Sequence, residues 1–122
     1  MGYHHVDVDA LDPAPDRPSV KRSISDAAGL DRLALHRYEV DPGEAIPLAY
    51  HYHDEQEEVF YVLAGTLAVE TPERTYEVGP DEAFVVEPES PQRAHNPESA
   101  DERVEALVAG APVVDDVHAY DR

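Results

Sequence analysis

Short runs of apolar or alternating residues recur between positions 33 and 109, and each run ends at proline, glycine or acidic residues. Successive side chains of a strand point to opposite faces, so runs of this length and spacing predict strands. With an arm or edge strand near residues 6–10, we expect roughly nine short strands. The main ones cover 33–40, 45–53, 58–64, 66–71, 75–78, 83–86, 93–95 and 104–109.

The residues between these runs favour an all-β fold. Eleven prolines and six glycines interrupt the chain too often for long helices. Gly65 can supply the positive φ of a tight turn, so we expect 58–64 and 66–71 to form a hairpin around it. Many short strands at this spacing, with no convincing helix, predict a sandwich or barrel.

The two ends of the chain carry weaker strand patterns than its middle. A proline-rich stretch precedes residue 19, and the last residues are polar. We therefore expect 1–30 to form an N-terminal arm and linker, 31–114 the β-barrel, and 115–122 a polar tail. A chain of 122 residues makes a single domain, which buries about two-thirds of its unfolded surface.

The run 58–64 is apolar on both of its faces. If Glu58 points into a barrel, the opposite face, which carries Val59, Tyr61 and Leu63, also has to be covered. Either the second sheet or a partner subunit can cover it. Because the chain is short, we expect the partner, and therefore a homodimer.

The net charge adds a condition for folding. Twenty-seven acidic residues oppose nine basic ones, which gives −18, and Lys21 is the only lysine. Such self-repulsion destabilises a small fold unless salt screens it, and the Debye length falls to about 3 Å at 1 M salt. We therefore expect a halophilic protein rather than an ordinary acidic one. The same charge argues against nucleic acid and anionic membranes as partners.

The sequence shows no recognisable signal for export or for insertion into a membrane. No apolar run has the length of a membrane span, and the N-terminus lacks the basic-then-apolar pattern of a signal peptide. We therefore expect a cytoplasmic protein. Without cysteine it has neither disulfides nor thiol chemistry.

Two histidines followed by a carboxylate are the strongest chemical signal of the chain. On a strand, the i, i+2 spacing places His51 and His53 on one face, with Cα atoms about 6.6 Å apart. Both imidazoles can then reach one metal ion, and Glu58 follows after a short polar turn. Buried polar groups of this kind are costly unless they pair with each other or hold a metal.

The segment from Gly43 to Gly65 resembles the first sequence motif of the cupin superfamily. That motif reads glycine, five residues, His-x-His, three or four residues, glutamate, six residues, glycine. The spacing of His51, His53 and Glu58 to one another and to Gly65 fits it, whereas seven residues rather than five separate Gly43 from His51.

The segment 79–96 is similar to the second cupin motif, with several exchanges. Family glycines would stand at Asp81 and Glu89, and the third metal-binding histidine at Gln92. Asn96 keeps its family place four residues later. The resemblance as a whole covers roughly residues 33–110.

The resemblance implies a double-stranded β-helix, a small jelly-roll barrel, around one divalent transition metal. Its ligands would be His51, His53, Glu58 and Gln92, and the ion Fe, Mn, Ni or Zn. Gln92 is a weaker, neutral donor than imidazole, which favours Fe²⁺ or Mn²⁺, and it could instead hydrogen-bond a water or a substrate. Phe60 would supply apolar pocket wall.

We also state expectations for Phe84 and for the histidines outside the candidate metal site. Phe84 would line the pocket beside Phe60. His95 lies an odd number of residues from Gln92 and should point to the opposite face, and His36 should face outward. The remaining histidines lie in terminal segments, where we expect no specific role: His4, His5 and His118.

Three functions are compatible with these residues. The first is a metalloenzyme, a dioxygenase or isomerase, that acts on a small chelating substrate. The second is a non-catalytic module that binds a small molecule. The third is a structural cupin whose metal site has decayed. No residue of the sequence selects among them, because a fold does not fix a function.

Overall fold

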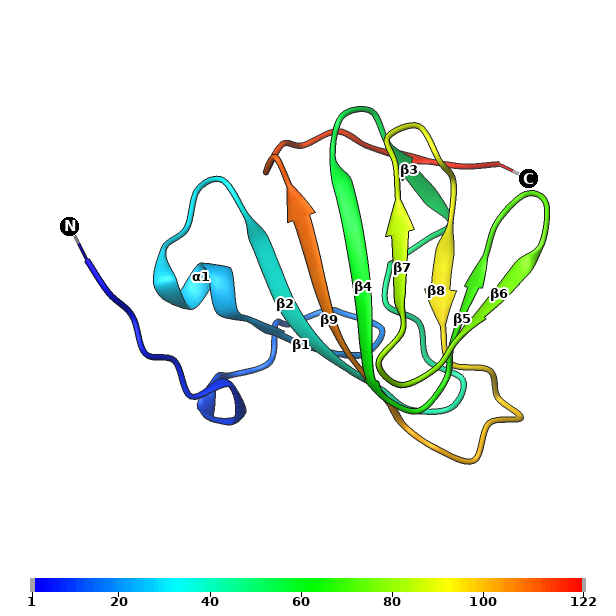
Figure 1. The fold of residues 1–122 in the computed structure, drawn as a ribbon, viewed down its shortest axis with the longest axis horizontal. Coiled ribbons are helices and arrows are strands. Elements are labelled where there is room, and N and C mark those ends of the chain that lie inside the picture. Colours follow the sequence, from blue (N-terminus) through cyan, green and yellow to red (C-terminus); the bar gives the residue numbers. More distant parts are fainter. Residues whose placement is uncertain (1, 122) are drawn as a thin grey trace.

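The structure is a computed structural model that describes residues 2–121. Its regular elements are almost all short strands, which confirms the all-β prediction (Figure 1). In chain order they are η1 (Val8–Ala10), β1 (Val20–Ser23), α1 (Ile24–Ala28), β2 (Ala34–Val40), β3 (His51–His53), β4 (Glu57–Ala64), β5 (Leu67–Glu70), β6 (Thr75–Val78), β7 (Ala83–Val86), β8 (Arg93–His95), β9 (Val104–Ala111) and β10 (Val117–Ala119).

Two layers of antiparallel strands face each other. One is a five-stranded sheet with the order β1-β2-β9-β4-β7. The other combines the strands β6-β5-β8 with the pair β10-β3. An isolated bridge from His51 of β3 to Gln92, just before β8, joins these two parts, and a second bridge links Ala45 to His95 of β8. Neighbouring strands are therefore often far apart in sequence, as a jelly roll requires.

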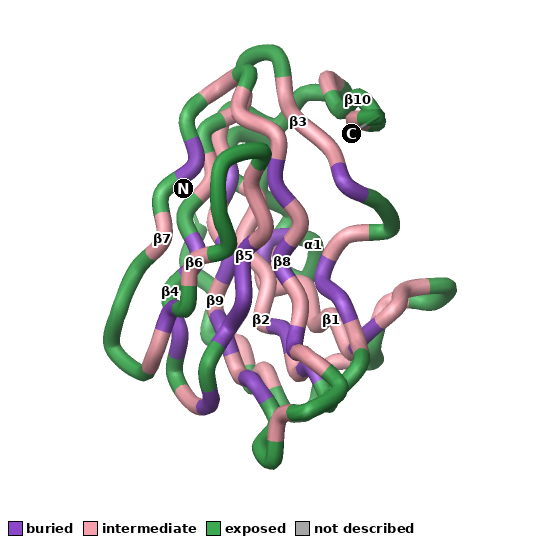
Figure 2. The backbone as a smooth tube through the Cα atoms, turned by 90° about the vertical axis from the view of Figure 1, so that its right-hand side faces the viewer, coloured by how far each residue is buried: buried purple, intermediate pink, exposed green. Residues whose placement is uncertain are grey.

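The hydrophobic core lies between the two layers, where Figure 2 shows most of the buried segments. Strand β9 alternates strictly between buried and half-buried residues, as a strand with one face in the core does. Phe60 and Val62 of β4 are buried against Leu67 and Val69 of β5 in one cluster. Truncation of a buried Phe to Ala lowers the free energy of unfolding by about 3–5 kcal/mol, so Phe60 contributes strongly to the stability of the core.

The expected hairpin of 58–64 with 66–71 is wrong. Strand β4 pairs with β7 and β9 in one layer, whereas β5 pairs with β6 and β8 in the other. The chain changes layers at Gly65, which has a φ of +75°. A Cβ there would lie 2.4 Å from the carbonyl oxygen of Arg103, so only glycine fits this crossing.

The ends of the chain contain more regular structure than their patterns indicate. The predicted arm includes β1 and a short helix, α1, which Ser23 caps through a hydrogen bond from the N–H of Asp26. The predicted tail includes β10, which pairs with β3. The division into arm, barrel and tail stays a prediction. None of the helices in residues 2–121 is long and apolar enough to cross a membrane.

Candidate metal centre

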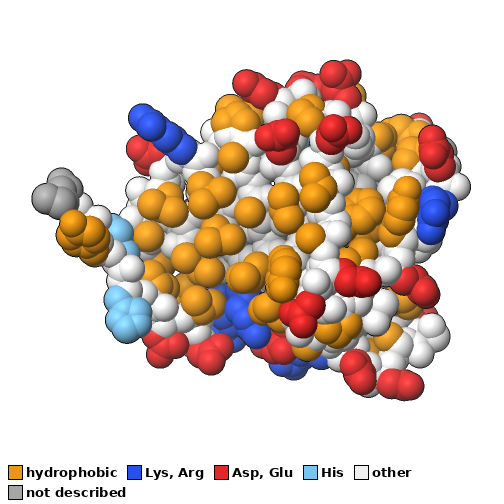
Figure 3. All heavy atoms as spheres, in the orientation of Figure 1, with side chains coloured by type: hydrophobic (Ala, Val, Ile, Leu, Met, Phe, Trp, Pro, Cys, Tyr) orange, Lys and Arg blue, Asp and Glu red, His pale blue; other side chains and the backbone are white. Residues whose placement is uncertain are grey.

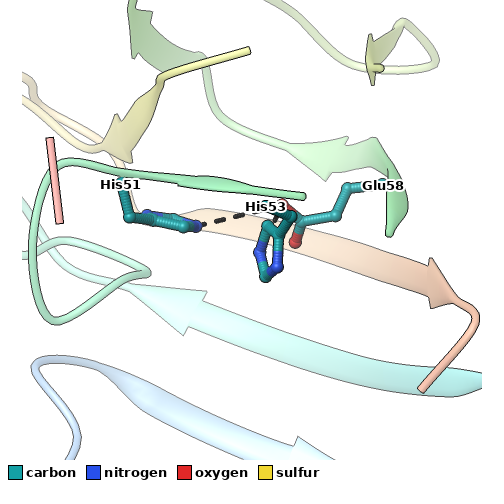
Figure 4. Close-up of side chains that lie close together, drawn as sticks. All are labelled: His51, His53 and Glu58. Carbon is teal, nitrogen blue, oxygen red and sulfur yellow. Dashed lines mark ion pairs between the residues drawn. The ribbon is translucent and has the colours of Figure 1, made fainter. Parts of the chain in front are cut away.

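His51, His53 and Glu58 meet at the junction of β3 and β4. One ligand atom from each of them lies within 4.8 Å of the others. Nε2 of His53 is 3.3 Å, and Nε2 of His51 is 4.0 Å, from the same carboxylate oxygen of Glu58 (Figure 4). All three side chains are largely buried, with 12–15% of their surface exposed. The predicted convergence of two imidazoles and one carboxylate is therefore present.

Hydrogen bonds fix which nitrogen each ring presents. Nδ1 of His51 lies 2.9 Å from the carbonyl oxygen of Ala49, which can only accept, so this Nδ1 carries the proton. Nδ1 of His53 lies 2.8 Å from a carboxylate oxygen of Asp116. Each Nε2 is thereby turned toward Glu58. Metal-binding histidines hold this arrangement, because the outer hydrogen bond sets the tautomer and the ring orientation.

Asp116 is the residue that sequence reasoning missed. Its second oxygen accepts hydrogen bonds from the backbone N–H groups of Glu55, at 2.7 Å, and Gln56, at 2.9 Å. It lies just before β10, and Val117 of that strand pairs with His53. Asp116 therefore holds His53 and the loop that leads to Glu58. Its spacing to the histidines carries no signal, since a contact across more than sixty positions depends on the fold.

His53 and Asp116 change each other's protonation. The hydrogen bond to Glu58, and next the one to Asp116, raise the pKa of His53 to about 9 against the opposing effect of burial. Burial acts to raise the pKa of Asp116, but bonds from His53 and from two backbone N–H groups lower it to about 2. Without a metal, His53 is therefore a cation between two carboxylates at neutral pH.

Gln92 lies at the same centre, as the motif alignment predicts. It is 2% exposed, and its backbone forms a pair of hydrogen bonds with His51. Its amide nitrogen donates to the carboxylate of Glu58 at 3.2 Å, while its buried side-chain oxygen has no hydrogen-bond partner among the described residues. Rotation of this amide by half a turn would exchange the two atoms and present an oxygen beside Glu58. Two nitrogens and two oxygens would then converge, a donor set that suits a divalent ion. Coordination by Gln92 stays a prediction.

A cavity of about 430 Å³ opens beside this centre, a size that suits a small ligand. His51, His53, Glu58 and Gln92 form part of its wall. The remaining lining residues come mainly from β2, the loop before β3, β9 and β10: Arg17, Lys21, Ala34, His36, Tyr38, Ile46, Pro47, Leu48, Ala49, Gln56, Phe60, Val108, Gly110, Val117 and Ala119.

The two phenylalanines predicted to line a pocket separate in the structure. Phe60 lines the cavity, whereas Phe84 is not among its lining residues. The two are cross-strand partners, but Phe84 belongs to the edge strand β7. Its ring packs on Tyr76 of the other layer, with centroids 5.0 Å apart. Phe84 therefore closes the far side of the core.

His36 faces the cavity, and the expectation that it points outward is wrong. It lies two residues before Tyr38, so both share the inner face of β2. Burial, followed by the charge of Lys21, lowers the pKa of His36 to about 4, and burial raises the pKa of Tyr38 to about 12. Both side chains are therefore neutral at pH 7.

The other histidines lie away from the centre. His95 is outside the group of converging ligands, and its Nε2 is 3.9 Å from Glu70. His118 does have specific contacts, contrary to expectation. Its ring stacks on Tyr52 and its Nε2 lies 2.6 Å from Asp54, which helps to attach β10 to β3.

Comparison with known proteins agrees with this architecture. A family model described as a cupin domain matches residues 36–110. The polyketide cyclase RemF from Streptomyces resistomycificus has 25% identity and a TM-score of 0.79 over 99% of this chain and 87% of its own. A protein described as a sugar phosphate isomerase, from Acidithiobacillus ferrooxidans, has 26% identity and a TM-score of 0.72 over 82% of this chain, which spans 64% of its length.

A third similarity concerns the fold alone. A protein with a double-stranded β-helix domain from Klebsiella pneumoniae has 15% identity and a TM-score of 0.75, over 99% of this chain and 100% of its own. The predicted double-stranded β-helix is thereby confirmed. No curated protein sequence matches this chain.

Proposed function

Because this chain belongs to the cupin family, we propose that it is a mononuclear metalloenzyme that acts on a small, oxygen-rich molecule. His51, His53 and Glu58 would hold one divalent ion, with Gln92 or water beside them. The observation that carries this proposal is the orientation of the two rings. Each Nδ1 is engaged by an oxygen outside the site, and each Nε2 faces the same carboxylate.

The reaction that we favour is a redox-neutral rearrangement, an isomerisation or cyclisation, rather than a dioxygenation. Two solved structures at 25–26% identity are described as a cyclase and a sugar phosphate isomerase, which supports this choice. When bound, a divalent ion supplies Lewis-acid polarisation of a carbonyl oxygen. Tyr38, a protonated phenol, would donate a hydrogen bond to substrate oxygen, and neutral His36 is the candidate proton acceptor.

A non-catalytic binding protein is the second candidate. The contact between the amide nitrogen of Gln92 and Glu58 favours it, because this contact satisfies the carboxylate without a metal. The same cavity would then bind a small molecule through hydrogen bonds and apolar contacts alone.

We also propose that a second copy of the chain covers the outer face of β4 and β7. Val59, Tyr61, Leu63 and Val85 are 37–64% exposed on this face. Figure 3 shows hydrophobic side chains gathered on one face of the molecule, with acidic side chains mainly toward its edges. In a chain of charge −18, contact between two copies is least opposed where the surface is uncharged.

Titration of metal-free protein with Mn²⁺, Fe²⁺, Ni²⁺ and Zn²⁺ in high salt tests the metal site. We expect one ion per chain. His53→Ala should abolish stoichiometric binding, Gln92→His should tighten it, and His95→Ala, the matched control, should leave it unchanged. If His95→Ala abolishes binding while His53→Ala retains it, the assignment of the ligands is wrong.

Proton exchange separates the enzyme from the binding protein. An isomerase that removes a proton next to a carbonyl exchanges it with solvent. We expect NMR in D₂O to show metal-dependent exchange for members of a panel of small hydroxy ketones and hydroxy aldehydes, and loss of that exchange in His36→Gln. Binding of panel members without exchange would instead support the non-catalytic function.

A further inference from the structure

Two cations stand in the cavity wall of a strongly acidic protein. Arg17 and Lys21 both line the cavity, and Lys21 is the only lysine of the chain. Among residues 2–121, neither forms an ion pair with a carboxylate, although 27 acidic residues are available. Four other arginines do form such pairs: Arg22, Arg37, Arg93 and Arg103. Two further described cations, Arg32 and Arg74, also form no such pair, but they do not line the cavity. Both cations of the cavity wall therefore lack a carboxylate partner.

Arg17 retains hydrogen-bonding capacity that the protein does not use. One terminal nitrogen of its guanidinium donates to the carbonyl oxygen of Ile46 at 3.2 Å, and the guanidinium also hydrogen-bonds the side chain of Tyr38. Its Nε is buried and has no partner among the described residues. A guanidinium carries five N–H donors in a planar fork that fits the oxygens of a carboxylate or phosphate.

Strand pairing places Lys21 on the same cavity wall as Arg17. It is the register partner of Tyr38 in the β1–β2 ladder, so its side chain shares the inner face with Tyr38. Burial, followed by the charge of Arg17, lowers the pKa of Lys21, and the charge of Asp26 opposes this to a smaller extent. Two like charges are therefore held close together in a partly buried wall, an arrangement that an anion would relieve.

We propose that Arg17 and Lys21 form an anion subsite, which binds a carboxylate or phosphate group of the substrate. The other end of the same molecule would reach His51, His53 and Glu58 across the cavity. This substrate class rests on the proposed function at the metal end, but the anion subsite itself does not. A small anionic molecule with metal-binding oxygens at its far end is then the preferred ligand.

A set of hydroxamates tests the subsite. Each has the same metal-binding head, and the far end carries a carboxylate, a phosphonate or a neutral carboxamide of matched size. Chain lengths of two, three and four methylenes cover the cavity. Isothermal titration calorimetry with metal-free and with Zn²⁺-loaded protein gives the affinity of each probe. The affinity of a charged probe divided by that of its carboxamide partner measures how much the negative charge contributes to binding.

We expect at least one charged probe to bind about tenfold or more tightly than its carboxamide partner in wild-type protein. Whether the carboxylate probe or the phosphonate probe binds more tightly shows which of the two groups the subsite prefers. Arg17→Gln and Lys21→Gln should bring the ratio close to one while the affinity of the carboxamide probe stays unchanged, which also reports that the variants are folded. Arg74→Gln removes the same charge from a residue that stacks on Tyr76, outside the cavity wall, and should keep the ratio.

A ratio near one in the wild type, or an unchanged ratio in both cavity variants, would overturn the proposal. The same experiment tests the proposed metal centre independently of the anion subsite. If Zn²⁺ adds nothing to the affinity of any hydroxamate, the proposed metal centre is wrong, and the ratio in metal-free protein still decides the anion subsite.

Discussion

A carboxylate oxygen of Asp116 lies 2.8 Å from Nδ1 of His53, and this contact joins the C-terminal segment of the chain to the candidate metal centre. The segment crosses the top of the barrel in Figure 1. Asp116 is 9% exposed, and its other oxygen holds the backbone of the loop between β3 and β4. Asp116 is therefore a positioning residue, which would act on a bound metal through the ring of His53.

Asp116→Asn should weaken metal binding by about 10- to 100-fold, because the outer carboxylate orients the ring and raises its basicity. The matched control is Asp115→Asn, which removes the same charge from the exposed neighbouring residue and should leave affinity within about twofold of wild type. Titration of both variants with Zn²⁺ in the same high-salt buffer measures the difference. Equal affinities in the two variants would show that Asp116 has no role at the metal.

The pKa of His53 predicts how the stability of metal-free protein changes with pH. Hydrogen bonds to Glu58 and Asp116 raise it from an ordinary value of 6.5 to about 9. A raised pKa adds stability that is complete below the unfolded value and is lost as pH rises through the folded one. We therefore expect the melting temperature to fall between about pH 6.5 and pH 9.

A His53→Gln variant supplies the control for that decline. It lacks the titrating group, so its melting temperature should change less over the same range when both proteins are measured with a chelator in constant high salt. Parallel curves for the two proteins would assign the decline to other groups.

The charge of −18 predicts a strong dependence on salt. At 0.1 M salt the Debye length is about 10 Å, and at 1 M it is about 3 Å, so repulsion among surface carboxylates is largely removed. The melting temperature of the metal-free protein should rise steeply between 0.05 M and 2 M KCl. A melting temperature that stays level over this range would contradict the halophilic interpretation.

The exposed face of β4 and β7 predicts a dimer in solution. Val59 and Val85 are cross-strand partners on it, and Val85 is 64% exposed. Sedimentation equilibrium in high salt should give twice the chain mass of 13.5 kDa for the wild type. Val85→Glu would place a charge in the contact and should give a monomer.

Val113→Glu is the matched control for the dimer. Val113 is also exposed, at 47%, but it follows β9 rather than lying on β4 or β7. This variant should sediment like the wild type. A monomeric wild type would refute the dimer outright.

Local spacing was enough to predict most strands between residues 33 and 111 and the convergence of His51, His53 and Glu58. It failed at 6–10, which contains a 3-10 turn, and at 46–50, which forms no strand. The alternation of side chains sets which residues share a face, and short strands leave few other arrangements. The backbone supports the alignment of the second motif as well. Asp81 and Glu89, which stand where the family has glycine, both have positive φ, at 64° and 66°. Glycine adopts this conformation without the penalty that other residues incur.

Contacts between distant segments could not be predicted in this way. Asp116 reaches His53 only because β10 pairs with β3, and no local pattern encodes that pairing. The hairpin around Gly65 failed for a related reason, since a glycine turn between two strands is also compatible with a change of layer. The orientation of His36 could have been predicted from the alternation of side chains, because His36 and Tyr38 share the inner face of β2.

The central claim is that the two imidazoles and Glu58 bind one ion. Anomalous difference density from crystals of Zn²⁺-loaded protein tests it most directly. We predict one strong peak per chain at about 2.0–2.2 Å from Nε2 of His51, Nε2 of His53 and a carboxylate oxygen of Glu58. Strong density elsewhere, with none between these three residues, would contradict the assignment of the metal centre.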